Sequence, residues 1–205
     1  MKTSGFDFLA PVYDSMARFF FGRSIMASQS WFFNKIPAGS RILILGGGTG
    51  WILEELQKCD ATSTIWYVEI SSAMMKRAQH WKVMNDVHFI LGTEEMIPPG
   101  LVFDVVITNF YLDLFSDDKL KWVVQHINRH TSSPTTWLVA DFIDGKIWWQ
   151  RLMLKTMYLF FNVVCDIQAK QLPHWHKRLE EQGWKEIHGK FWYGTFIKST
   201  LWKRA

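Results

Sequence analysis

The chain has 205 residues, of which 48% are hydrophobic and 20% charged; these values are typical of a folded globular domain and argue against long disordered segments. The 23 basic and 19 acidic residues give a net charge of +4, and the basic residues form no stripe of the kind that favours nucleic-acid binding. The two cysteines, Cys59 and Cys165, lie far apart and match no metal-ligand spacing, so we expect reduced thiols in a cytoplasmic protein without a bound metal.

The N-terminal part of the chain is predicted to be helical. No signal peptide is expected, because Asp7, Pro11 and Asp14 interrupt the first stretch before an apolar run forms. Apolar residues then recur at helical spacing from 8 to 33, which predicts one or two helices that end at residues 37–39.

From residue 41 onward, short apolar runs alternate with segments of helical character. The first run, R-I-L-I-L, is followed at once by glycines, which is typical of a strand buried on both faces. Such alternation implies right-handed crossovers and a largely parallel sheet with helices on both faces. The predicted strands are 41–45, 64–70, 87–91, 103–108 and 135–142, and the predicted helices between them are 51–58, 71–81 and 116–129.

The C-terminal part departs from this alternation. The apolar segment 147–165 carries four strongly polar residues, so no membrane-spanning helix is expected. A predicted helix at 172–182 precedes two predicted strands, 184–188 and 191–201, joined by a tight turn near Gly189, and a hairpin of this kind requires antiparallel strands. We therefore expect an α/β, Rossmann-like, doubly wound mixed sheet of about seven strands, mostly parallel with an antiparallel C-terminal hairpin. Nicotinamide-binding domains do not normally close in this way.

The strongest local signal is L-G-G-G-T-G at residues 45–50, between a predicted strand and a predicted helix. In open α/β sheets, ligands bind at the carboxyl ends of the strands, where glycines let the backbone approach a ligand and a helix start favours an anionic group. The dinucleotide fingerprint G-x-G-x-x-G would need a third glycine where this chain has Trp51, whose indole should obstruct the packing of helix on strand. An NAD(P)-dependent oxidoreductase is therefore disfavoured, although it stays an alternative.

Glu69 is a candidate sugar-binding residue at the end of the second predicted strand. A carboxylate at this place can accept hydrogen bonds from both hydroxyls of a ribose. Glu69 follows W-Y-V and precedes a predicted helix that begins S-S-A-M, and this placement favours ribose binding over a solvent-facing acid.

Several segments together resemble the class I S-adenosylmethionine-dependent methyltransferases, and most closely the small-molecule group that includes the quinone-biosynthesis methyltransferases. These segments are I-L-I-L-G-G-G-T-G, W-Y-V-E-I-S-S-A-M, L-G-T-E-E-M-I-P and F-D-V-V-I-T-N-F-Y-L-D-L-F, with A-P-V-Y-D near the N-terminus. The resemblance covers about residues 6–142. We accordingly expect a single methyltransferase domain over 1–205, with an N-terminal helical lid at 1–38, a cofactor-binding core at 39–142, and substrate-side helices and C-terminal strands at 143–205.

The resemblance implies that S-adenosyl-L-methionine is the cofactor and that it lies across the first two strand ends. Glu69 would hold its ribose, and Ile70 would pack on its adenine. The residues that would cradle its methionine part are Gly46, Gly47, Gly48, Thr49 and Gly50.

The remaining implied contacts come from three other segments. Thr93 and Glu94 would lie near the amino edge of the adenine. Asn109 and Phe110 would lie beside the sulfonium, and Tyr13 would lie on a lid over the site.

Two positions depart from the pattern of the family. Ile44 stands where the family usually has an acid that helps to hold the methionine ammonium, and Thr93 stands where it often has Asp. These departures keep a non-catalytic, nucleoside-binding relative as an alternative.

The expected reaction is methyl transfer by in-line displacement to a small-molecule acceptor. The aromatic-rich segments indicate that this acceptor is apolar or aromatic, and it can be lipophilic. A general base is needed only for a protonated acceptor. Asp113 and Asp141 are candidates, but a capping or solvated acid is an equal alternative for each, so no base is assigned.

No nucleic-acid substrate is expected, because residues 109–112 lack the two prolines of the N-P-P-Y pattern of DNA amino-methylating enzymes, although their aromatic side chains could stack a base. The acceptor's identity and the oligomeric state do not follow from the sequence.

Overall fold

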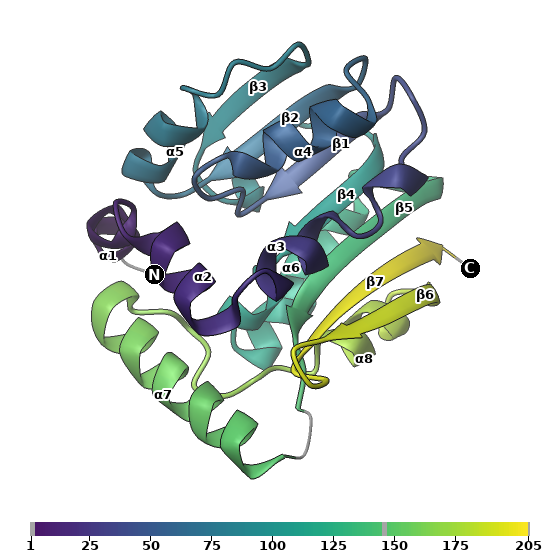
Figure 1. Ribbon diagram of the computed structural model, residues 1–205. Coiled ribbons are helices and arrows are strands. Elements are labelled where there is room, and N and C mark those ends of the chain that lie inside the picture. The colour runs from purple at the N-terminus through teal and green to yellow at the C-terminus, as the bar shows by residue number, and fades with distance from the viewer. Residues whose placement is uncertain (1–2, 145–146, 205) are drawn as a thin grey trace.

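The computed structural model describes residues 3–144 and 147–204, and these form a seven-stranded sheet in the order β3-β2-β1-β4-β5-β7-β6 (Figure 1). The pairs among β1 to β5 are parallel, whereas β7 pairs antiparallel with both β5 and β6. The structure therefore confirms the predicted doubly wound, mixed sheet with an antiparallel ending.

The alternating region follows the predicted order closely. Its strands are β1 (Arg41–Leu45), β2 (Thr64–Glu69), β3 (Asp86–Leu91), β4 (Phe103–Asn109) and β5 (Thr131–Phe142). The segments between them contain α4 (Trp51–Cys59), α5 (Ser72–Ala78), η2 (Glu94–Met96), η3 (Leu112–Leu114) and α6 (Asp117–Asn128). Elements labelled η are short 3-10 helices.

Helix α5 begins where the sequence predicts but ends early. The Ser71 hydroxyl oxygen caps it by accepting a hydrogen bond from the Met74 amide at 3.1 Å. The predicted end at residue 81 is wrong, because Trp81 leaves the helix and donates its indole N–H to the Thr49 carbonyl oxygen at 3.0 Å.

The N-terminal part forms three α-helices rather than the predicted one or two. They are α1 (Thr3–Leu9), α2 (Tyr13–Phe21) and α3 (Ser24–Ser30), followed by η1 (Phe33–Lys35). Gly22 separates α2 from α3, since its φ of +58° lies in the left-handed region that ends helices.

The C-terminal part consists of α7 (Trp148–Cys165), α8 (Trp175–Glu181), β6 (Trp184–Trp192) and β7 (Ile197–Arg204). The predicted turn near Gly189 is wrong, because Gly189 lies inside β6 and pairs with Thr200. The chain reverses at residues 193–196, where Tyr193, Gly194 and Thr195 all have positive φ. Gly189 instead follows a register shift in β6, where a side chain on its Cα would meet the Glu186 carboxylate.

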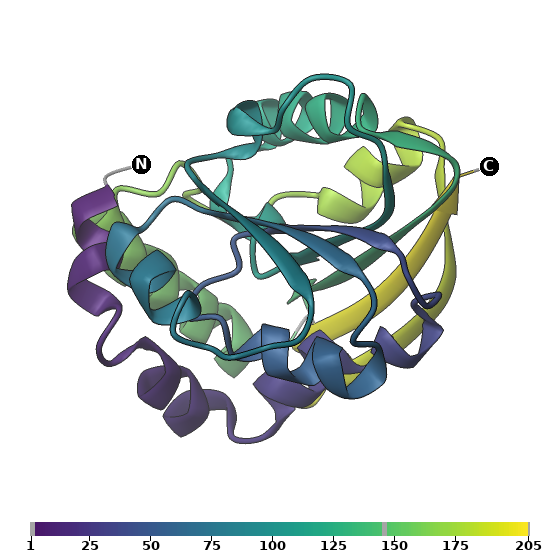
Figure 2. The same cartoon turned by 90° about the horizontal axis from the view of Figure 1, so that it is seen from above.

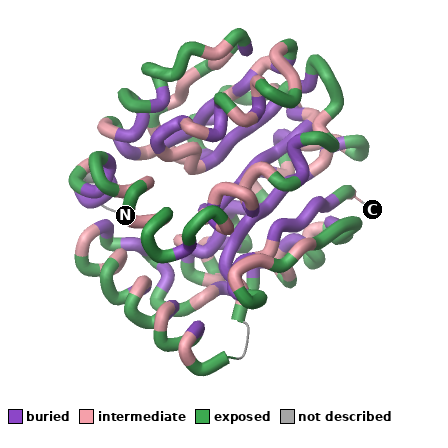
Figure 3. Tube along the Cα trace, viewed as in Figure 1, coloured by how far each residue is buried: buried purple, intermediate pink, exposed green. Residues whose placement is uncertain are grey.

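Helices cover both faces of the sheet, with α6 and α8 on one and α4 on the other (Figure 2). The central strands are buried along most of their length, as Figure 3 shows. A third apolar cluster joins α1, α2, α3 and α7 to the end of β5 and the β6–β7 turn. This cluster lies beyond the carboxyl ends of the parallel strands, where ligands bind in folds of this class.

Among the described residues, no helix has both the length and the apolar character needed to cross a membrane.

Candidate functional site

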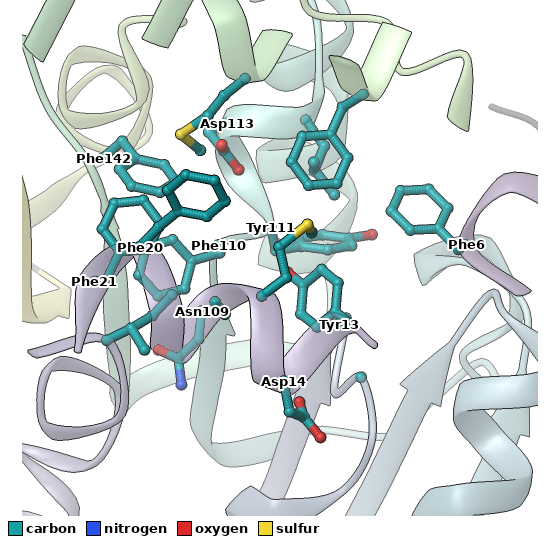
Figure 4. Close-up of a pocket in the computed structure, with 18 of the residues that line it drawn as sticks. Phe6, Tyr13, Asp14, Phe20, Phe21, Asn109, Phe110, Tyr111, Asp113 and Phe142 are labelled. Atoms are coloured by element: carbon teal, nitrogen blue, oxygen red, sulfur yellow. The ribbon is translucent and has the colours of Figure 1, made fainter. Parts of the chain in front are cut away.

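A cavity of about 420 Å³ lies where the carboxyl ends of β1, β2 and β4 face the N-terminal helices and α7 (Figure 4). One end of the cavity is polar and formed by the loop after β1 together with Glu69. The other end is apolar and formed by side chains of α2, α7 and the end of β5. One continuous space therefore joins a polar end to an apolar end.

The loop of residues 46–50, called here the glycine loop, has a backbone that requires its glycines. Gly46, Gly48 and Gly50 have φ of +67°, +68° and +89°, which side chains rarely tolerate. Gly47 has no room for a side chain, since a Cβ there would lie 2.1 Å from Cζ of Tyr67. The cavity is lined by residues 46–49, whereas Gly50 packs against Ala78.

Glu69 closes the polar end of the cavity and is only 5% exposed. Its two carboxylate oxygens accept hydrogen bonds from the amides of Gly48 at 2.9 Å and Ser71 at 2.8 Å. Burial raises the pKa of Glu69, while these amide hydrogen bonds oppose the rise. Each oxygen retains a further lone pair, so the carboxylate can still accept hydrogen bonds from a sugar.

Helix α2 carries two residues to the polar end. Tyr13 lines the cavity, and Asp14 lies beside the glycine loop (Figure 4). Asp14 accepts a hydrogen bond from the Thr49 hydroxyl at 2.8 Å. Sequence reasoning assigned no role to Asp14, although it is the last residue of the A-P-V-Y-D segment that carries part of the resemblance.

The end of β4 supplies the next wall. Asn109 and Phe110 both line the cavity, and Phe110 takes a φ of +49° that turns the chain there. The Phe110 ring lies 4.9 Å from that of Phe142 at the end of β5. Ile70, which follows Glu69, lines the cavity as well.

Thr93 and Glu94 are placed apart from these residues and do not line the cavity. The Thr93 hydroxyl oxygen accepts a hydrogen bond from the Glu95 amide at the start of η2. Glu94 is buried and accepts a hydrogen bond from the Tyr111 hydroxyl at 2.5 Å. The structure thus brings nine of the twelve predicted site residues to one cavity and gives Gly50, Thr93 and Glu94 packing or capping contacts.

The apolar end contains a buried acid. Asp113, in η3, lines the cavity and is 6% exposed, and its Oδ1 atom has no hydrogen-bond partner. Its amide donates to Oδ2 of Asp141 at 3.3 Å, and Asp141 lies fully buried behind it. Burial raises the pKa of Asp113 to about 7, and burial together with the charge of Asp113 raises the pKa of Asp141 well above its ordinary value.

Comparison with known families matches residues 42–133 to the model described as "Methyltransferase domain". The match runs from β1 into β5 and includes the glycine loop and Glu69. No curated protein matches this chain.

Solved structures with the same fold include DhpI in complex with SAH, at 15% identity and a TM-score of 0.73 over 100% of this chain and 95% of that one. Magnesium protoporphyrin IX methyltransferase (ChlM) from Synechocystis PCC 6803 with bound SAH is 14% identical, with a TM-score of 0.66 over 97% of both chains. The mitomycin 7-O-methyltransferase MmcR is 14% identical, with a TM-score of 0.69 over 100% of this chain and 61% of that one. At these identities the likeness establishes the fold.

Proposed function

We propose that this chain, a class I S-adenosylmethionine-dependent methyltransferase, transfers the methyl group to a small apolar or aromatic acceptor that occupies the apolar end of the cavity. The observation that carries this proposal is the single continuous cavity, which joins the glycine loop and Glu69 to a wall of aromatic side chains. Two structural neighbours are named for small-molecule acceptors, a mitomycin 7-O-methyltransferase and a magnesium protoporphyrin IX methyltransferase, and this supports a small-molecule acceptor here.

The residues at the polar end fit the cofactor. The backbone of residues 46–49 faces the cavity, and its glycines have no side chains that would keep a ligand away from it. The buried carboxylate of Glu69 has free lone pairs that can accept hydrogen bonds from ribose hydroxyls. Ile44 stands where the family usually has an acid that helps to hold the methionine ammonium group. Asp14 forms no ion pair with any described residue, so its carboxylate is free to attract that ammonium group instead. The cofactor supplies an electrophilic methyl group on a sulfonium.

The protein's own contribution is orientation and exclusion of water. Asn109 and Phe110 at the end of β4 stand between the polar and apolar ends, and α2 and α7 cover the cavity. Holding two reactants in line can contribute on the order of 7–11 kcal/mol of barrier reduction. We propose on this basis that residues 1–38 act as a lid, that 39–142 bind the cofactor, and that the segment after β5 forms the acceptor side.

Cytoplasmic location is part of the same proposal. Its support is that Cys59 is an exposed free thiol and Cys165 a buried one, which is typical of proteins in reducing compartments.

The test is thermal unfolding in the presence of S-adenosylmethionine, S-adenosylhomocysteine, NAD or NADP, followed by methyl transfer to a panel of aromatic acceptors. A ligand at 100 times its dissociation constant adds about 2.7 kcal/mol of stability, so we expect a clear rise in Tm with the two adenosyl compounds alone. Stabilisation by NAD or NADP alone would contradict the proposal. Binding of S-adenosylmethionine without turnover of any acceptor would favour the non-catalytic alternative.

A further inference from the structure

We propose that Asp113 is the general base of this enzyme and that its acceptor is a phenol or an enol, whose hydroxyl proton passes to the carboxylate of Asp113. The inference rests on the proposed function, because it places the acceptor at the apolar end of the cavity. It extends that function by naming the acceptor's reacting group and the residue that receives its proton.

The position of Asp113 is the first argument. The residue lies in η3, four positions after Asn109, and Figure 4 shows its carboxyl oxygens directed into the cavity. Oδ1 is buried without a hydrogen-bond partner, so the oxygen that an acceptor hydroxyl in the cavity can reach is Oδ2.

The backbone holds this carboxyl in place. The Asp113 amide donates to Oδ2 of Asp141, and the Phe142 amide donates to Oδ1 of Asp141 at 2.8 Å. The Tyr158 hydroxyl of α7 donates to the Asp113 carbonyl oxygen at 3.3 Å. η3 is therefore tied to both β5 and α7, which holds the Asp113 backbone at the edge of the cavity.

No described cation forms an ion pair with Asp113 or Asp141. Each carboxyl is therefore buried without a compensating charge, which disfavours the ionisation of both at once. Asp141 is fully buried and does not line the cavity, whereas Asp113 does, so Asp113 is the carboxyl of the two that an acceptor can reach. The other titratable or charged groups that face the cavity are Tyr13, Asp14 and Arg18 of α2, Glu69 at the end of β2, Tyr111 after β4, and Tyr158 of α7.

The chemistry of the surroundings selects the acceptor class. The apolar end presents aromatic rings from three elements, which suits a flat ring. A base that titrates near pH 7 is matched to a phenolic hydroxyl, whose pKa is about 10, and is poorly matched to a water-like hydroxyl near 16. The aromatic residues around the carboxyl are Phe20, Phe21, Phe110, Phe142, Tyr158 and Phe161.

The proposed step balances. The acceptor oxygen releases its proton to the Asp113 carboxylate and forms a bond to the methyl carbon, while the carbon–sulfur bond breaks and its electron pair stays on sulfur. The products are a methyl ether, a neutral thioether and a protonated Asp113, which returns its proton to water when the ether leaves.

The first test measures binding in protein loaded with S-adenosylhomocysteine, with 4-methylphenol and 4-methylanisole as probes. The two probes differ only in the hydroxyl proton, which is replaced by a methyl group in the anisole. We expect the wild-type protein to bind the phenol at least tenfold more tightly and Asp113→Asn to lose this preference. Asp118→Asn, the same chemical change at an exposed position at the start of α6, should keep it.

The inference is overturned if the wild-type protein shows no preference for the phenol, either because neither probe binds or because both bind equally. This result does not depend on the folding of a variant.

The second test follows the infrared band of protonated carboxyl groups as pH changes. The component of this band that is lost in Asp113→Asn should titrate near neutral pH. Titration of that component in the ordinary range of aspartate would also overturn it. Failure of S-adenosylhomocysteine to bind would instead refute the proposed function, so the two failures are distinguishable.

Discussion

Glu69 joins the glycine loop to the start of α5 through one buried carboxylate. Its hydrogen bonds to the Gly48 and Ser71 amides hold the backbone that faces the cavity, and the side chain itself lines the same space. The side chain therefore has a structural role beside the binding role proposed for it, and a test must separate them.

Glu69→Ala is expected to weaken binding of S-adenosylmethionine by more than tenfold. The reason is the loss of two charge-assisted hydrogen bonds to the ribose, each worth about 1.5–3 kcal/mol. Isothermal titration calorimetry measures the effect. Glu69→Gln, which keeps the shape and one acceptor oxygen, should fall between the wild-type protein and the alanine variant.

The matched control is Asp86→Asn, an exposed acid on the edge strand β3, which should bind as the wild-type protein does. A dissociation constant for Glu69→Ala equal to that of the wild-type protein would show that another residue holds the ribose.

Asp113 should make stability depend on pH. Its pKa rises from 3.8 in the unfolded chain to about 7 in the native state, so between these values the native state binds more protons than the unfolded state. The free energy of unfolding therefore falls as pH rises through this window, by at most about 1.4 kcal/mol per pH unit for one group. Asp113→Asn should have a flatter profile in urea unfolding between pH 4 and 8, and an unchanged slope would contradict the assignment.

At the scale of elements, α2 is held over the polar end of the cavity by few polar contacts. The hydrogen bond from the Thr49 hydroxyl to Asp14 links it directly to the glycine loop. Helix α1 is fixed by a different acid, Asp7, which accepts from the Ala73 amide at the start of α5 at 2.9 Å. Two acids thus anchor the N-terminal helices, one to the glycine loop and one to the start of α5.

Thr49→Val is expected to loosen α2, because it removes the hydroxyl donor and keeps the shape of the side chain. Amide hydrogen exchange in residues 13–21 should become faster, and S-adenosylhomocysteine should protect these amides less than in the wild-type protein. Ser15→Ala, an exposed hydroxyl on the same helix, is the control and should leave the protection by ligand unchanged. Equal protection in Thr49→Val and the wild-type protein would show that the lid is held elsewhere.

At the scale of the whole molecule, the sheet has two buried faces that share their strands. Leu43 in β1 is fully buried on the face covered by α6, whereas Ile44 faces α4. The two clusters therefore cannot lose packing independently at the central strand, and the described residues should unfold together.

Leu43→Ala should lower the free energy of unfolding by about 2–5 kcal/mol, since it leaves a cavity at the centre of the sheet. Urea unfolding followed by tryptophan fluorescence and by circular dichroism should give coincident transitions at a lower midpoint. Leu159→Ala, at a position on α7 that is 67% exposed, is the control and should change stability by about 0.5 kcal/mol or less. Two separate transitions would contradict a single cooperative unit.

The elements of the core and their order follow from local sequence patterns. The apolar residues 42–45, directly before a run of glycines, are typical of a strand buried on both faces, and Gly46, Gly48 and Gly50 adopt positive φ angles that residues with side chains rarely adopt. The turn of the final hairpin was misplaced, because the sequence around Gly189 has the composition of a turn and the true reversal at 193–196 depends on three residues held in left-handed conformations.

The tertiary structure decided which side chains meet. Asp14, Thr49 and Glu69 are distant in sequence and lie on one cavity, whereas Glu94 is turned away toward the Tyr111 hydroxyl. The acid character of Asp113 was likewise not readable from the chain, since a pKa depends on burial and on the neighbouring Asp141, and both follow from how β4, β5 and α7 pack. Local patterns set backbone conformation through short-range sterics and periodicity, but the electrostatics of a site arise from contacts between segments that only folding brings together.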